Sequence, residues 1–108
     1  MVNLMRRIKT VSNLIEKAEN KGFAKINGKY YGGQKMEKYA ISIEDGKLEL
    51  RHWETTTLEL DLDNKKISYY YGESKSDADS INTVLDYFNI EGKASYRPSI
   101  NKFSIIGA

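Results

Sequence analysis

One stretch of the chain, Leu58-Glu59-Leu60-Asp61-Leu62-Asp63, alternates leucine with a carboxylate. Successive side chains of a β-strand point to opposite faces of its sheet, so this pattern predicts a strand with its leucines in a core and its acids in water. A sheet with one solvated face is typical of antiparallel structure. We therefore expect a mostly antiparallel sheet that has one wet side.

Helical periodicity flanks this region. Apolar residues between Leu4 and Ala18 recur at three- and four-residue spacing, which predicts an amphipathic helix that ends near Gly22. A second helix is expected to begin with Ser76 as its N-cap, because the acids that follow favour the positive end of a helix dipole. Its apolar stripe is expected to pack against the leucines of the strand and consists of Ile81, Val84, Leu85 and Phe88.

Turn residues divide the rest of the chain into strands. Asn27-Gly28 predicts a tight hairpin turn, and further turns are expected at 44–47 and 63–66. Two more strands follow the second helix, on either side of Pro98. The predicted fold is thus a single α+β domain over residues 1–108, with an N-terminal helix, an antiparallel β meander, a second helix and C-terminal β-strands.

The absence of cysteine excludes a disulfide framework, a thiolate zinc site and a cysteine nucleophile. In the N-terminal segment, Arg6 and Arg7 follow too few apolar residues for a secretory signal, and no apolar run approaches the roughly 20 residues that span a bilayer. We therefore expect a cytoplasmic protein, located in the host cytoplasm if a phage encodes it, with no membrane partner.

Residues that carry common catalytic chemistry are scarce. His52 is the only histidine; it could pair with Glu54 on the same strand face, but the pattern favours a partly exposed residue that packs. A calcium loop over the acids at 59, 61 and 63 fails, because lysines stand where an oxygen ligand and a glycine are needed. Gly32-Gly33 lacks the context of a phosphate loop. The sequence indicates no catalytic residue, no metal, no cofactor and no enzyme activity.

The net charge of +2 is unevenly distributed, since residues 41–92 carry twelve acids against five lysines or arginines while both ends are basic. An acidic sheet face could steer association with a basic protein surface. Trp53 and Tyr70 are the aromatic anchors expected for such a partner. The acidic residues expected to contact it are Glu54, Glu59, Asp61, Asp63, Glu73, Asp77 and Asp79.

The stretch Trp53-Glu54-Thr55-Thr56-Thr57-Leu58, together with residues 69–85, resembles small uncharacterised proteins of phages and mobile elements in Gram-positive bacteria. The resemblance brings no assigned catalytic residues. Proteins of that setting commonly act by stoichiometric binding, and they include inhibitors of CRISPR nucleases and of other defence enzymes. The resemblance therefore implies an anti-CRISPR-like inhibitor whose partner is a nucleic-acid-handling host enzyme.

Two alternatives remain open at this stage. The chain could be a structural or self-assembling domain that forms a homodimer through an uncovered edge strand. It could instead bind single-stranded nucleic acid, because flat aromatic rings beside lysines can stack bases. The residues that would do so are Arg6, Arg7, Lys25, Lys29, Tyr30 and Tyr31.

Overall fold

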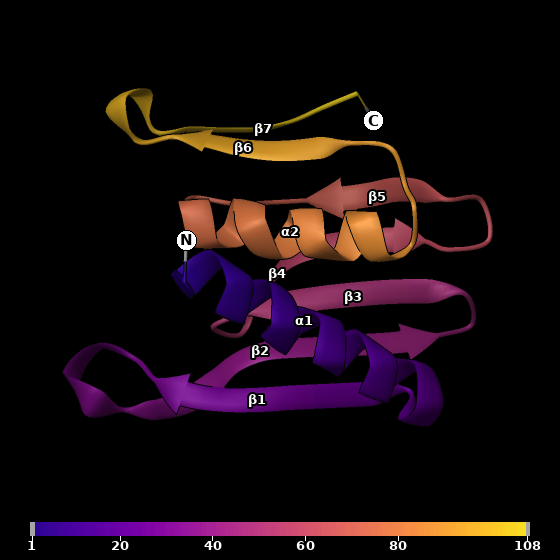
Figure 1. Ribbon diagram of the computed structural model, residues 1–108, viewed down its shortest axis with the longest axis horizontal. Helices are drawn as coiled ribbons and strands as arrows, with labels where there is room; N and C mark the ends of the chain where they lie inside the picture. The colour runs from indigo at the N-terminus through magenta and orange to yellow at the C-terminus, as the bar shows by residue number, and fades with distance from the viewer. Residues whose placement is uncertain (1, 108) are drawn as a thin grey trace.

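The computed structural model describes residues 2–107, in which five strands form an antiparallel sheet in the order β1-β2-β3-β4-β5 and two more form a separate hairpin, β6-β7 (Figure 1). The predicted α+β class and its order of elements are confirmed. The elements are α1 (Val2–Lys21), β1 (Phe23–Lys29), the 3-10 turn η1 (Tyr31–Gly33), β2 (Lys35–Glu44), β3 (Lys47–His52), β4 (Thr55–Asp61), β5 (Lys66–Tyr70), α2 (Lys75–Tyr87), β6 (Lys93–Arg97), the 3-10 turn η2 (Pro98–Ile100) and β7 (Lys102–Ile106).

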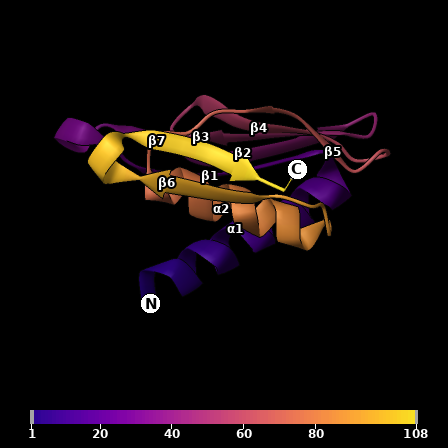
Figure 2. The same cartoon turned by 90° about the horizontal axis from the view of Figure 1, so that it is seen from above.

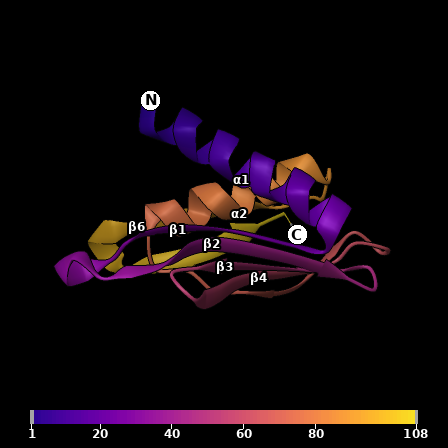
Figure 3. The same cartoon turned by 90° about the horizontal axis from the view of Figure 1, so that it is seen from below.

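The elements form two layers, which Figures 2 and 3 show from opposite edges: α1 and α2 lie on one side of the five-stranded sheet. The β6-β7 hairpin continues beyond β5 and is tied to α2 through Asn82. The side-chain amide of Asn82 donates to the Ala94 carbonyl at 2.9 Å and accepts from the Ala94 N–H at 2.7 Å. No other element of residues 2–107 covers the opposite face of the sheet, which we call the outer face.

The core lies between the helices and the inner face of the sheet. Leu58 and Leu60 of β4 are completely buried, whereas Glu59 between them is exposed, so the predicted alternation is confirmed. Leu62 and Phe88 are only partly buried but pack against the same core. Fully or almost fully buried side chains from the helices and from β3 complete it: Val11, Leu14, Ile15, Ile81, Val84, Leu85, Leu48 and Leu50.

The ends of the helices follow local capping rules. Gly22 takes a φ of +85° and its N–H donates to the Ala18 carbonyl at 2.7 Å, as expected for the end of α1. The N-cap of α2 is Ser74 and not the predicted Ser76: the Ser74 hydroxyl accepts from the N–H of Asp77 at 3.1 Å. With Ser74 as the N-cap, the Asp77 carboxylate accepts in return from the Glu73 N–H at 3.0 Å. This exchange is similar to a capping box.

The hairpin turn predicted at Asn27-Gly28 is wrong. Strand β1 continues through this pair with a bulge between Ile26 and Asn27, and the chain reverses at η1 instead. A Cβ atom on Gly28 would lie 3.1 Å from both Lys38 Cδ and Trp53 Cη2. The absence of a side chain at Gly28 therefore lets Lys38 and Trp53 pack against the backbone of β1. This packing overrides the local preference of Asn27-Gly28 for a turn.

The other predicted turns are confirmed. The β2–β3 connection contains Asp45 and Gly46 with φ values of 52° and 75°. The β4–β5 connection is closed by the Asp61 carboxylate, which accepts from the backbone N–H and the side-chain amide of Asn64 at 3.1 and 2.7 Å. Short polar side chains of this kind hold turns by bonding to the backbone that follows them.

The buried alternation of β4 predicts the stability of a variant. Leu60→Ala should lower the free energy of unfolding by about 2–5 kcal/mol, because a completely buried leucine is replaced by a residual cavity. Urea denaturation followed by circular dichroism measures the change. Glu59→Ala, one residue away on the exposed face, is the control and should stay within about 0.5 kcal/mol of wild type. Equal losses at the two positions would contradict the assignment.

Candidate functional site

The outer face of the sheet carries carboxylates from three adjacent strands, β2, β3 and β4. They border a hollow of about 630 Å³ near the β2–β3 and β4–β5 turns, which Figure 1 shows on the right. We call it the acidic hollow. One lysine, Lys47, also lines it. Its acidic residues are Glu44, Asp45, Glu49, Glu59 and Asp61.

Two of these acids face each other directly. Glu49 and Glu59 are partners in the β3–β4 register, and their other cross-strand neighbours are Ser42 and Tyr69, so no lysine or arginine stands opposite either of them. Like charges placed directly opposite on a sheet are destabilising. Glu49 is restrained by the Thr56 hydroxyl, which donates to it at 2.7 Å.

Asp61 has a different environment at the edge of the hollow. Hydrogen bonds from the Asn64 side chain and backbone, aided by the charge of Lys47, hold the pKa of Asp61 below its ordinary value. It therefore stays ionised at neutral pH while it closes the β4–β5 turn. Asp63 follows in that turn and lies beside Gly46 of the β2–β3 turn, which brings the two turns together at this end of the sheet.

The seven acids predicted to form one face do not do so. Glu59, Asp61 and Asp63 lie at or beside the acidic hollow, whereas Glu54 and Glu73 are exposed at the opposite end of the sheet. The residues that sequence reasoning missed are Glu44, Asp45 and Glu49. The alternation Leu48-Glu49-Leu50 carried the signal for Glu49, because it repeats the pattern of β4 on the neighbouring strand.

Asp77 and Asp79, which the sequence predicts to contact a partner, are instead engaged within the protein. Asp77 is only 6% exposed, and Asp79 pairs with Arg7 across the two helices. Both acids occupy the first turns of α2, on a helix that is packed against α1 and the sheet. Their carboxylates are therefore used inside the protein.

The buried partner of Asp77 is His52. Its Nδ1 lies 2.7 Å from an Asp77 carboxylate oxygen, and its ring stacks on Tyr39 with centroids 4.5 Å apart. The expectation of a partly exposed His52 that could pair with Glu54 is wrong, because β3 ends at His52 and Glu54 lies in the turn beyond it. The two residues that meet are 25 positions apart.

Burial is the largest influence on the pKa of Asp77 and raises it, but the hydrogen bonds from His52, Glu73 and Ser74 and the charge of His52 outweigh it. The net pKa of Asp77 is therefore below its ordinary value, and the carboxylate is ionised at neutral pH. An aspartate that orients a histidine is also part of catalytic triads. Within residues 2–107, however, His52 forms no hydrogen bond to a serine or threonine hydroxyl.

A second hollow, of about 590 Å³, lies at the end of the sheet that is on the left in Figure 1, where the β1–β2 loop, the β3–β4 turn and the start of α2 meet. We call this the aromatic end. Trp53 is one of its lining residues, and its ring centroid is 5.1 Å from that of Tyr30 and 5.8 Å from that of His52. Its lining also includes Lys29, Tyr31, Tyr71, Glu73 and Asp77.

Part of the predicted nucleic-acid set comes together here. Lys29, Tyr30 and Tyr31 line the aromatic end. Arg6 and Arg7 line a neighbouring hollow of about 320 Å³ with Lys38 and Tyr39. Lys25 does not join them, because it pairs with Ala40 in the middle of the β1–β2 ladder.

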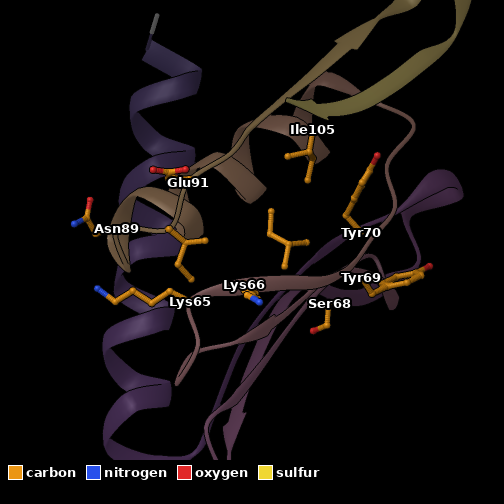
Figure 4. A pocket seen from close by; sticks show the side chains of 10 residues that line it. Lys65, Lys66, Ser68, Tyr69, Tyr70, Asn89, Glu91 and Ile105 are labelled. Atoms are coloured by element: carbon orange, nitrogen blue, oxygen red, sulfur yellow. The ribbon is translucent and has the colours of Figure 1, made fainter. Parts of the chain in front are cut away.

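The two predicted aromatic anchors lie on different surfaces. Tyr70 lines a groove of about 870 Å³ between β5 and β7, where its ring centroid is 6.2 Å from that of Phe103. Figure 4 shows Tyr70 and Ile105 on the two strands that border this groove. Because β5 and β7 are not hydrogen-bonded to each other, both leave a strand edge open there, as the predicted self-assembling alternative requires.

Comparison of the chain with protein-family models, with curated proteins and with solved structures finds no match. None of the helices in residues 2–107 is long and apolar enough to cross a membrane. In the same part of the chain, no group of three or more His, Asp or Glu side chains is placed to hold a metal ion.

The His52–Asp77 pair predicts a pH-dependent stability. The carboxylate of Asp77 has a depressed pKa in the folded state, so its contribution is present above the ordinary value of 3.8 and is lost as the pH falls through the folded value. Asp77→Ala should lower the free energy of unfolding at pH 7 by about 1–3 kcal/mol, because His52 and the Glu73 N–H lose their buried acceptor.

Thermal melting between pH 7 and pH 2 measures this effect. As the pH falls through the acid range, the melting temperature of wild type should decrease more steeply than that of Asp77→Asn, because this variant lacks the carboxylate that becomes protonated. Asp86→Asn, which changes an exposed acid of the same helix, is the control and should follow wild type. Parallel acid slopes for all three proteins would contradict the role of Asp77.

Proposed function

We propose that the protein is a non-catalytic binding protein that docks the acidic hollow on a basic surface of a protein partner. The observation that carries this proposal is the Glu49–Glu59 pair, in which two glutamates are direct cross-strand partners on an uncovered sheet face. The isolated domain tolerates this repulsion. A lysine or arginine of a partner placed between them would turn the repulsion into two favourable contacts.

The shape of the surface supports protein docking. The acids come from neighbouring strands of one sheet and from the β2–β3 turn, so the backbone fixes the spacing of the positions that carry them. A cluster of fixed negative charge also raises the rate at which a positively charged partner is captured.

A nucleic-acid channel is the class of basic surface that we propose as the target. Its lysines and arginines neutralise phosphates, and a row of carboxylates competes for the same side chains. We extend the proposal to the partner expected from residues 53–58 and 69–85 in the sequence analysis, namely a CRISPR nuclease or another defence nuclease. The contact residues of this proposal are two acids predicted from the sequence, Glu59 and Asp61, and two further acids that line the same hollow, Glu44 and Glu49.

Two exposed acids allow a clean test. Glu44→Lys combined with Glu59→Lys reverses charge at the hollow, and neither side chain forms a side-chain hydrogen bond within residues 2–107. The matched control, Glu16→Lys with Asp86→Lys, makes the same change in net charge on exposed positions of α1 and α2. Both variants should melt within a few degrees of wild type.

The measurement uses a partner recovered by affinity capture from a lysate of the native host and then purified. The hollow variant should associate about tenfold or more slowly than wild type, and the control variant should not. Raising the salt from 0.1 to 0.5 M should weaken the wild-type complex, because the Debye length falls from about 10 Å to about 4 Å. Equal association rates for the two variants would contradict docking through the acidic hollow.

A further inference from the structure

The aromatic end presents a continuous series of rings that runs from the core to solvent. Tyr39 is buried and stacks on His52, His52 contacts Trp53, and Trp53 contacts Tyr30. The series ends at Tyr31, whose ring centroid is 4.7 Å from that of Tyr30 and whose surface is 84% exposed. The core thus positions rings whose outer members are open to a ligand.

The Trp53 ring is held in place at a conformational cost. Trp53 and Glu54 form the β3–β4 turn with φ values of 50° and 65°, which bulky residues rarely adopt. The Trp53 N–H donates to the Lys38 carbonyl at 2.8 Å, and the ring lies against Gly28, where a Cβ would crowd it. A strained conformation maintained by its surroundings is typical of positions that present a side chain for function.

Positive charge surrounds these rings. Lys29 lines the hollow itself, and Lys38 packs beside Trp53 over Gly28 and lines the adjoining hollow with Arg6. Lys29, Lys38 and Arg6 form no ion pair within the described chain.

The acids nearby are already engaged. Asp77 is bonded to His52, Asp79 is paired with Arg7, and Glu73 accepts from the Tyr71 hydroxyl at 3.0 Å. Two exposed acids still oppose an anionic ligand: Glu54 in the β3–β4 turn, and Glu73, whose charge is not cancelled by a bond from a neutral hydroxyl.

We infer that the aromatic end binds single-stranded nucleic acid, with an unpaired base stacked on the exposed Tyr31 ring in the hollow that Trp53 also lines, and with the adjoining phosphates close to Lys29 and Lys38. Such binding requires rings on which bases stack and cations without an ion-pair partner, and Lys38, whose ammonium lies 5.9 Å from the centroid of the Tyr39 ring, is one of these cations. A cationic side chain would be repelled by Lys29, and a neutral sugar would leave the lysines unused. The inference concerns the end of the sheet opposite the acidic hollow and does not rest on the docking function.

Trp53 is the only tryptophan of the chain, so its fluorescence reports on the site without a label. The probe is an oligodeoxythymidylate of about eight nucleotides, a length within the site sizes of single-strand binders. Titration of the full chain at low salt should quench Trp53 fluorescence to saturation. In a log–log plot, affinity should fall with salt with a slope of about −1.4 for two phosphate contacts.

Two exposed positions test the contacts. Tyr31→Ala should raise the Kd by about 5- to 150-fold, the change that corresponds to the loss of one stacked base. Lys29→Ala should reduce the salt slope by about 0.7. Both side chains are exposed, so both variants should melt like wild type. Glu54→Gln, which removes one of the two opposing acids, should tighten binding.

The matched control for the site is Tyr87→Ala, which removes a tyrosine from α2 that is exposed to a similar extent as Tyr30 and lines none of the three hollows or the groove. It should leave the Kd unchanged. An unquenched Trp53, or equal affinities of Tyr31→Ala and Tyr87→Ala, would overturn the inference. Quenching by a trimethyl-lysine peptide or a neutral oligosaccharide, without quenching by the oligonucleotide, would also overturn it and would assign the hollow to that ligand.

Discussion

The one-sided covering of the sheet is the constraint on which the other features depend. In residues 2–107, α1 and α2 lie together on the inner face of the five-stranded sheet and leave the outer face in water. Strands β3 and β4 must therefore alternate, with Leu48, Leu50, Leu58 and Leu60 buried. The intervening positions are free of packing, and there the chain can hold Glu49 opposite Glu59.

Local patterns were enough to predict the elements and most of the core. Leucine alternation in β4 and the helical spacing of the stripe that begins at Ile81 both depend only on neighbouring residues, and both are confirmed. Asn27-Gly28 shows where local preference fails, because Trp53 and Lys38 pack over Gly28 while β1 continues through this pair with a bulge. These two residues come from β2 and from the β3–β4 turn, so a short window around position 28 does not contain the competing interaction.

The candidate sites were less predictable than the fold, for the same reason. A run of acids between residues 54 and 79 gives no information about which carboxylates meet other residues. The structure uses Asp77 to hold His52 and Asp79 to hold Arg7, pairs separated by 25 and 72 positions. By contrast, Lys29, Tyr30 and Tyr31 are consecutive, so their presence at one site could be read from the sequence.

The buried His52–Asp77 pair connects the fold to the aromatic end. It joins the last residue of β3 to the first turn of α2, and Asp77 also accepts from the N–H that precedes the helix cap. Because His52 is fixed on both sides, by Asp77 and by the Tyr39 ring, the turn that follows it can hold Trp53 in a left-handed conformation. An apolar residue at position 52 could fill the same space, but it would not tie the turn to the helix.

The acidic hollow lies at the other end of a molecule that is 38 Å long and shares no lining residue with the aromatic end. The changes in the free energy of unfolding caused by a substitution in each surface should therefore add in the double variant, as expected for groups without shared partners.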